Sequence, residues 1–223
     1  MLERCGADTL DGLYADIPEG IRFKGDYDIP SSMSEQEIRL FFDQLAKQNR
    51  QLTCFAGAGV YDHYVPALIP QIAGRSEFLT SYTPYQAEIS QGTLHYIFEY
   101  QSMMAELTGM DISNASLYDG ATATAEAAMM ACAATKKCDT VLLSETVDPK
   151  VAEVVDTYAH FHGMRIVRIP ESDGTTDFVQ MGNLLDNGGV AGVIVQQPNR
   201  YGIVEDLQGV ADSCHAHKAL LIM

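Results

Sequence analysis

The sequence predicts an α/β protein in which a parallel-rich sheet is flanked by helices and preceded by an extended N-terminal arm and helix. Through the second half of the chain, short apolar runs alternate with helical patterns, which is typical of βαβ units. Continuous apolar runs indicate strands buried on both faces, as in parallel sheets. Residues 1–30 are rich in Gly, Asp and Pro and show little periodicity, so they predict the arm.

The first helix is expected from Ser34 to about residue 49. Ser34 and Glu37 have the spacing of a capping box, in which each side chain bonds the backbone of the other residue. Apolar residues then recur at helical intervals and predict one buried face. They are Ile38, Phe41, Phe42 and Leu45.

Residues 54–85 carry many Gly and Pro residues among aromatics, so long regular elements are not expected there. A second helix is expected over residues 92–108, with Ser90 as its N-cap and Gly109 as its left-handed terminator. Its buried stripe is predicted to be Leu94, Ile97, Phe98 and Leu107.

The second half of the chain contains four expected strands and four expected helices. The strands are residues 140–143, 165–169, 190–195 and 219–223. The helices are residues 119–135, 148–163, 179–185 and 205–217. Asp119 is expected to cap the first of these helices, and Asp148-Pro149 opens the second. We therefore expect three parts, namely an arm (1–30), a helical and loop region (31–116) and an α/β domain (117–223). We expect the last part to be incomplete, because the chain stops inside an apolar strand.

Composition excludes several classes of function. The 14 basic residues are scattered, Lys136-Lys137 is their only adjacent pair, and the formal net charge is -16, which disfavours nucleic acid and anionic lipid. No apolar run is long enough to span a bilayer, and the N-terminus lacks the apolar core of a signal peptide. Five cysteines at irregular spacing do not form a disulfide framework, so a cytoplasmic location is expected.

Three motifs have ordinary structural explanations. The segment Phe55–Val60 contains two glycines but lacks the third glycine and the βαβ setting of a dinucleotide site. His160 with His162, and His215 with His217, are two residues apart on helices, so neither pair faces one metal ion. We also discount Lys218 as a Schiff-base lysine, because it follows a helix end where lysine commonly covers carbonyl groups.

Two segments indicate a binding function. The first is a polar, aromatic loop that leads into the second helix, and such loops often carry ligand contacts. Its candidate residues are Tyr82, Thr83, Pro84, Tyr85, Gln86, Glu88, Ser90 and Gln91. The second is the helix start at Asp119, Gly120, Ala121 and Thr122, which has the geometry of a phosphate cradle. Asp119 supplies its own negative charge there, which favours a self-capped helix.

Together these segments resemble the glycine decarboxylase P-protein family. Residues 82–92 are similar to its signature, residues 107–116 with Asp119 match the next block, and residues 196–206 match a third. The resemblance covers most of residues 30–220. The short chain and its arm are similar to subunit 1 of the two-subunit bacterial form.

This resemblance implies the large-domain fold of fold-type-I pyridoxal phosphate-dependent transferases. It implies a glycine dehydrogenase (decarboxylating) that removes carbon dioxide from glycine and passes the aminomethyl group to the lipoyl arm of H-protein. Pyridoxal phosphate and its Schiff-base lysine would belong to subunit 2, in a heterotetramer with two of each subunit. No catalytic residue is expected on this chain, whose loop from Tyr82 to Gln91 would complete the partner's active site, while residues 119–122 would be a vestigial cradle.

Two alternatives remain open at this point. The chain could be a scaffold that stabilises subunit 2 without touching substrate, although a scaffold needs no dense set of polar groups in the 82–91 loop. It could instead be a self-sufficient pyridoxal phosphate enzyme, which requires a Schiff-base lysine that the sequence does not place.

Overall fold

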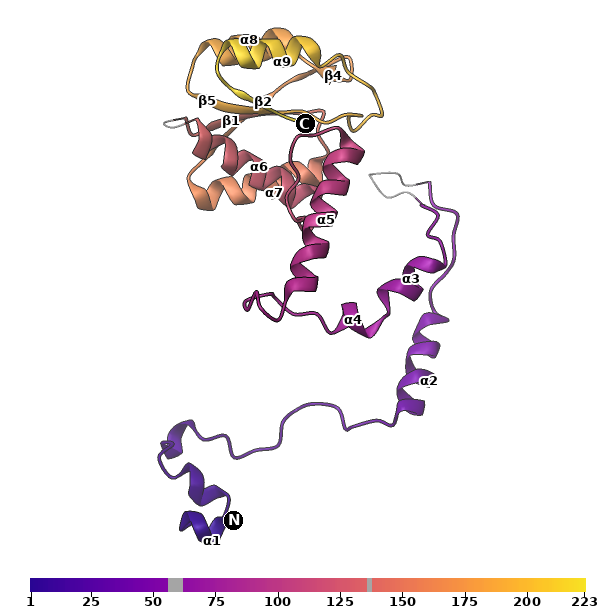
Figure 1. The fold of residues 1–223 in the computed structure, drawn as a ribbon, viewed down its shortest axis with the longest axis vertical. Coiled ribbons are helices and arrows are strands. Elements are labelled where there is room, and N and C mark those ends of the chain that lie inside the picture. The colour runs from indigo at the N-terminus through magenta and orange to yellow at the C-terminus, as the bar shows by residue number, and fades with distance from the viewer. Residues whose placement is uncertain (56–61, 136–137) are drawn as a thin grey trace. The chain divides into compact units, whose positions relative to one another are not determined.

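The computed structural model describes residues 1–55, 62–135 and 138–223, and Figure 1 shows its ribbon. The glycine-rich segment beyond Phe55 and the pair Lys136-Lys137 therefore lie outside the described residues. The chain forms two compact units, Met1–Cys54 and Phe55–Met223. The division at residues 30 and 116 stays a prediction.

The first unit contains short helical segments and one longer helix. Its elements are α1 (Leu2–Cys5), η1 (Asp11–Tyr14), η2 (Glu19–Ile21) and α2 (Glu35–Ala46). The first three interrupt the predicted arm. The capping box at α2 is confirmed, because Glu37 N donates to Ser34 Oγ at 3.3 Å and Ser34 N donates to Glu37 Oε2 at 2.7 Å. None of the α2 residues is buried, so its apolar face is exposed.

The second unit begins with three helices that bury no residue. They are α3 (Leu68–Ala73), α4 (Ser76–Leu79) and α5 (Gln91–Thr108). The left-handed Gly109 ends α5 as predicted, with φ 70°. The predicted buried stripe is wrong, because Phe98 is 68% and Leu107 77% exposed. An amphipathic pattern shows that one face of a helix is apolar, but not what covers that face. No described residue covers the apolar face of α5.

The remaining residues form a four-stranded parallel sheet in the order β2-β1-β5-β6. Its strands are β1 (Thr140–Ser144), β2 (Arg165–Ile169), β5 (Val190–Ile194) and β6 (Leu220–Ile222). Its helices are α6 (Gly120–Ala134), α7 (Pro149–His162), α8 (Phe178–Asp186) and α9 (Gln208–Ala216). All were predicted within a few residues, whereas the antiparallel hairpin of β3 (Glu171–Ser172) and β4 (Thr175–Thr176) was not.

Helices cover both faces of the sheet, as Figure 1 shows, with α6 and α7 on one side and α8 and α9 on the other. Successive residues of β1 point to opposite faces, so Leu142 joins the core under α8 and α9 while Val141 and Leu143 join the core under α6 and α7. This double burial explains the continuous apolar strands.

Small residues allow α6 to lie close to the sheet. Ala125, Ala128 and Ala131 are fully buried along one side of the helix. Opposite them, a Cβ atom built on Gly192 would lie 3.2 Å from Ala131 Cβ and 3.2 Å from Leu220 O. The register of β1 and β5 also shifts between Thr140 and Val141, which indicates a bulge beside this contact.

Candidate functional site

Two neighbouring cavities lie where β5 ends. The loop cavity, of about 860 Å³, is lined by residues 148–150 at the start of α7 and by residues 196–202 after β5. The sheet-end cavity, of about 410 Å³, lies between the start of α6 and the ends of β5 and β6. Both volumes suit small molecules, and the carboxyl ends of parallel strands are where open α/β sheets bind ligands.

Three amide side chains follow β5, and two of them hold the loop together. The Gln197 side-chain amide makes two hydrogen bonds to the backbone of Glu205. Its Nε2 donates to Glu205 O at 2.9 Å, and its Oε1 accepts from Glu205 N at 3.0 Å. Asn199 Oδ1 accepts from the backbone N–H groups of Tyr201 and Ile203, at 2.9 and 3.1 Å. These amides therefore shape the loop rather than face a ligand.

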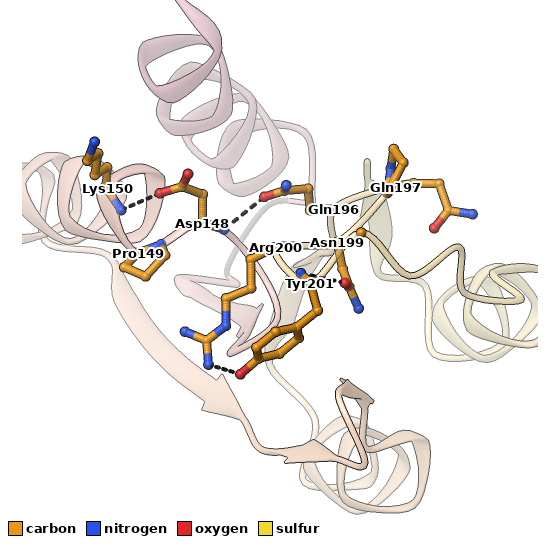
Figure 2. A pocket seen from close by; sticks show the side chains of 10 residues that line it. Asp148, Pro149, Lys150, Gln196, Gln197, Asn199, Arg200 and Tyr201 are labelled. Atoms are coloured by element: carbon orange, nitrogen blue, oxygen red, sulfur yellow. Dashed lines mark hydrogen bonds between the residues drawn. The ribbon is translucent and has the colours of Figure 1, made fainter. Parts of the chain in front are cut away.

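Gln196 differs from the other two amides. Its Oε1 accepts from Asp148 N at 2.8 Å, as drawn in Figure 2. Its Nε2 makes no hydrogen bond to any described residue. Gln196 and Gln197 both line the two cavities, but both ends of the Gln197 amide are bonded to the backbone of Glu205, so Gln196 is the one of the two that is placed to contact a bound molecule.

The carboxylate of Glu205 is buried at the centre of the loop, with 6% of the residue exposed. Neutral donors surround it: Asn199 Nδ2 at 2.8 Å, Thr146 Oγ1 at 3.1 Å and Thr176 N at 3.1 Å. Thr146 donates its hydroxyl to Glu205, and the hydroxyl oxygens of Ser144, Thr146 and Thr176 lie 2.8–3.3 Å from one another. The predicted helix 205–217 therefore begins only at Gln208, since Glu205 belongs to this network.

A charged cluster fixes the other side of the loop. Arg200 donates to Glu171 Oε2 at 2.9 Å, the Tyr201 hydroxyl donates to the same oxygen at 2.7 Å, and Arg200 also contacts the Tyr201 hydroxyl (Figure 2). The Tyr201 hydroxyl and then the Arg200 guanidinium hold the pKa of Glu171 below its usual range. The cluster ties the β3–β4 hairpin to the wall of the loop cavity.

The start of α6 satisfies its own hydrogen bonds. Asp119 Oδ1 accepts from Thr122 N at 2.8 Å and from Thr122 Oγ1 at 2.9 Å, so the predicted cap is confirmed. The backbone N–H of Thr122 is the main cause that lowers the pKa of Asp119. Among the residues that the structure describes, no Lys or Arg lines the sheet-end cavity beside it. These residues do not fit the phosphate of pyridoxal phosphate, which would face the Asp119 carboxylate.

The predicted loop residues lie elsewhere. Tyr82 and Tyr85 are 80% and 81% exposed, with ring centroids 6.3 Å apart. Pro84 and Ser90 are half-buried, and the others are exposed. None of these eight residues is among the described residues that line the loop cavity or the sheet-end cavity. Ser90 occupies the N-cap of α5 but makes no side-chain capping bond.

The sequence-based reasoning missed the residues that line the cavities, above all Asp148, Gln196, Arg200 and Tyr201. A usable signal was present, because polar residues directly after a buried strand lie at the edge of the sheet where ligands bind.

His160, His162, His215 and His217 lie at helix C-terminal ends, as expected. His217 Nδ1 lies 2.8 Å from Ser213 O and Nε2 lies 3.0 Å from Asp186 Oδ1, and these contacts raise the pKa of His217. Among the described residues, no group of three or more His, Cys, Asp or Glu side chains is arranged to hold a metal ion. No described helix is both long and apolar enough to cross a membrane.

A parallel sheet in this order, with helices on both faces and a site at its carboxyl edge, is the large-domain architecture of fold-type-I pyridoxal phosphate enzymes. A solved structure agrees, namely glycine decarboxylase (P-protein) of the glycine cleavage system in inhibitor-bound form. It has a TM-score of 0.87 and 40% sequence identity, over 99% of this chain and 49% of that chain.

The glycine cleavage system P-protein family model matches residues 1–223. Proteins named probable glycine dehydrogenase (decarboxylating) subunit 1 from Anoxybacillus flavithermus and Lysinibacillus sphaericus are each 47% identical, over 100% of this chain and 50% of their own length. The same-named protein of Moorella thermoacetica is 44% identical over 99% of this chain and 49% of its own. The chain therefore belongs to the glycine cleavage system P-protein family and spans about half the length of these relatives.

Proposed function

We propose that this chain is part of subunit 1 of a glycine dehydrogenase (decarboxylating), acting in the cytoplasm. The enzyme removes carbon dioxide from glycine and transfers the aminomethyl group to the lipoyl arm of H-protein. The observation that carries the proposal is the match of all 223 residues to the P-protein family, with relatives named subunit 1 at 47% identity.

In this proposal subunit 2 holds pyridoxal phosphate, and the two subunits form a heterotetramer with two of each. The cofactor supplies an electron sink for the carbanion that decarboxylation produces. Two observations support its assignment to the partner: the Asp119 carboxylate already caps the start of α6, and no Lys or Arg in the described part of the chain lines the adjoining cavity. The exposed apolar faces of α2 and α5 support assembly with other protein surface.

The proposal predicts that this chain alone does not form a stoichiometric pyridoxal phosphate adduct. The chain and subunit 2 are each incubated with the cofactor, treated with borohydride and measured by intact mass. We expect the adduct on subunit 2 and only trace, non-stoichiometric labelling here. A stoichiometric adduct on one lysine of this chain would support the self-sufficient enzyme instead.

The exposed tyrosines of the 82–91 loop are proposed to orient glycine or the lipoyl arm in the active site of subunit 2, together with Gln86 and Glu88. The two tyrosine hydroxyls make no hydrogen bond to any described residue, so replacing Tyr82 or Tyr85 by Phe removes only a group available to other molecules. We expect turnover of the assembled enzyme to fall about tenfold, as for one lost hydrogen bond in the transition state.

Turnover is measured by release of carbon dioxide from glycine in the presence of subunit 2 and H-protein. Tyr100→Phe is the matched control, since Tyr100 lies on α5, is 40% exposed and is outside the loop. Complex formation, followed by sedimentation, is expected to be unchanged in all three variants. Normal turnover in both loop variants would favour the scaffold function.

A further inference from the structure

The 82–91 loop lies between α4 and α5, and its own hydrogen bonds do not fix how the two helices are joined. Among the described residues, every hydrogen bond made by residues 80–90 joins groups no more than four residues apart in the sequence. Ser81 Oγ, for example, donates to Glu77 O at 2.9 Å. Such bonds form the turns at each end of the loop, but none of them connects α4 to α5.

An aromatic pair connects the two helices instead. Phe78 lies near the end of α4 and Tyr96 lies in the second turn of α5, and their ring centroids are 6.3 Å apart at an interplanar angle of 78°. This edge-to-face arrangement is favourable for aromatic rings and shifts an equilibrium about two- to twelvefold beyond the effect of burial alone. The pair therefore closes the base of the loop.

The pair acts on the loop rather than on the core of the domain. Phe78 and Tyr96 are 46% and 41% exposed, and neither belongs to the two buried clusters that hold the sheet to its helices. A loop that is closed at its base has fewer conformations, and Pro84 restricts the backbone further. The contact thus limits the directions in which Tyr82 and Tyr85 can project.

We propose that Phe78 and Tyr96 are positioning residues, and that their contact holds the 82–91 loop in the direction that its tyrosines need to reach the active site of subunit 2. The role at that active site rests on the proposed function. The effect on the order of the loop concerns this chain alone, so the two parts are tested separately.

The first test measures how often the loop opens. The full chain is treated with chymotrypsin under native conditions, and the rates of cleavage after Tyr82 and Tyr85 are followed by mass spectrometry, because cleavage in a folded protein depends on the population of the open form. Phe78→Leu and Tyr96→Leu each remove one ring of the pair and are expected to raise both rates about fivefold. The thermal midpoint is expected to stay the same, since neither ring is in a buried cluster.

Two further variants serve as controls. Tyr96→Phe keeps the ring and removes a hydroxyl that makes no hydrogen bond to any described residue, so it should be cleaved at the rate of the parent chain. Phe98→Leu removes another exposed aromatic ring from α5 and should also leave the rates unchanged. Unchanged cleavage in both Leu variants of the pair, or an equal increase in either control, would overturn the proposal.

The second test asks whether the pair acts through the loop tyrosines. In the enzyme assembled with subunit 2 and H-protein, Phe78→Leu is expected to lower kcat about threefold, with the same amount of complex by sedimentation. Tyr85→Phe is expected to cost about tenfold in the parent but only about threefold in the Phe78→Leu background, because fewer loops then present the hydroxyl.

A tenfold cost of Tyr85→Phe in both backgrounds would give the pair a purely structural role and would overturn the proposal. If the unmodified chain supports no turnover with subunit 2, the proposed function fails, and the cleavage rates still decide whether the pair orders the loop. The two conclusions therefore fail separately.

Discussion

Replacing Glu205 by Ala is expected to lower the free energy of unfolding by about 3 kcal/mol, because three buried donors lose their acceptor. Thr176 N has no alternative acceptor among the described residues, while Asn199 Nδ2 retains Gly174 O at 2.8 Å and Thr146 Oγ1 can turn toward a neighbouring hydroxyl. The estimate is therefore below the sum of three full desolvation penalties of roughly 1–3 kcal/mol each.

Urea unfolding followed by far-UV circular dichroism measures this loss. Glu126→Ala on the exposed side of α6 is the control, with an expected change within about 0.5 kcal/mol. If the two variants were equally stable, the Glu205 network would contribute nothing net, and the loop after β5 would be held by its amide bonds alone.

Replacing Ala131 by Leu is expected to lower the free energy of unfolding by about 3 kcal/mol, because the larger side chain overpacks the core. Ala131 is 1% exposed and faces Gly192, where even one added Cβ would lie 3.2 Å away. Three more carbons on Ala131 must push α6 from β5 or adopt a strained rotamer, and such insertions typically cost about 1–3 kcal/mol.

Ala133 provides a matched control on the same helix, because it is exposed and Ala and Leu have similar helix propensities. In the same urea experiment, the free energy of unfolding of Ala133→Leu should lie within about 0.5 kcal/mol of that of the parent chain. A Leu at residue 131 that left stability unchanged would mean that α6 can move away from the sheet without cost.

The elements that the sequence predicts well are those whose ends are marked locally. Ser34, Asp119 and Asp148 bond their own helix starts, and Gly109 and Gly163 end helices in the left-handed region. Each such signal acts within a few residues, so no tertiary contact is needed to interpret it. The double burial of the strands is likewise visible in their continuous apolar runs.

The parts that were missed depend on contacts between distant residues. The local sequence places Glu205 at the start of a helix. Its carboxylate instead accepts hydrogen bonds from Thr146 and Thr176, which are 59 and 29 residues away and which local sequence does not reveal. Gln196, Gln197 and Asn199 are all side-chain amides, and only their hydrogen-bond partners distinguish Gln197 and Asn199, which hold the loop, from Gln196. The apolar face of α5 was predicted, but its surroundings were not.

The strand order also bears on how the domain folds. Thr140 pairs with Arg165 on one side of β1 and with Val190 on the other, so the second pairing closes a loop about twice as long as the first. Each doubling of loop length costs only about 0.6 kcal/mol in closure entropy, yet non-local pairings slow folding. The β1–α7–β2 unit is thus the natural nucleus, and substitutions around β5 should act mainly by speeding unfolding.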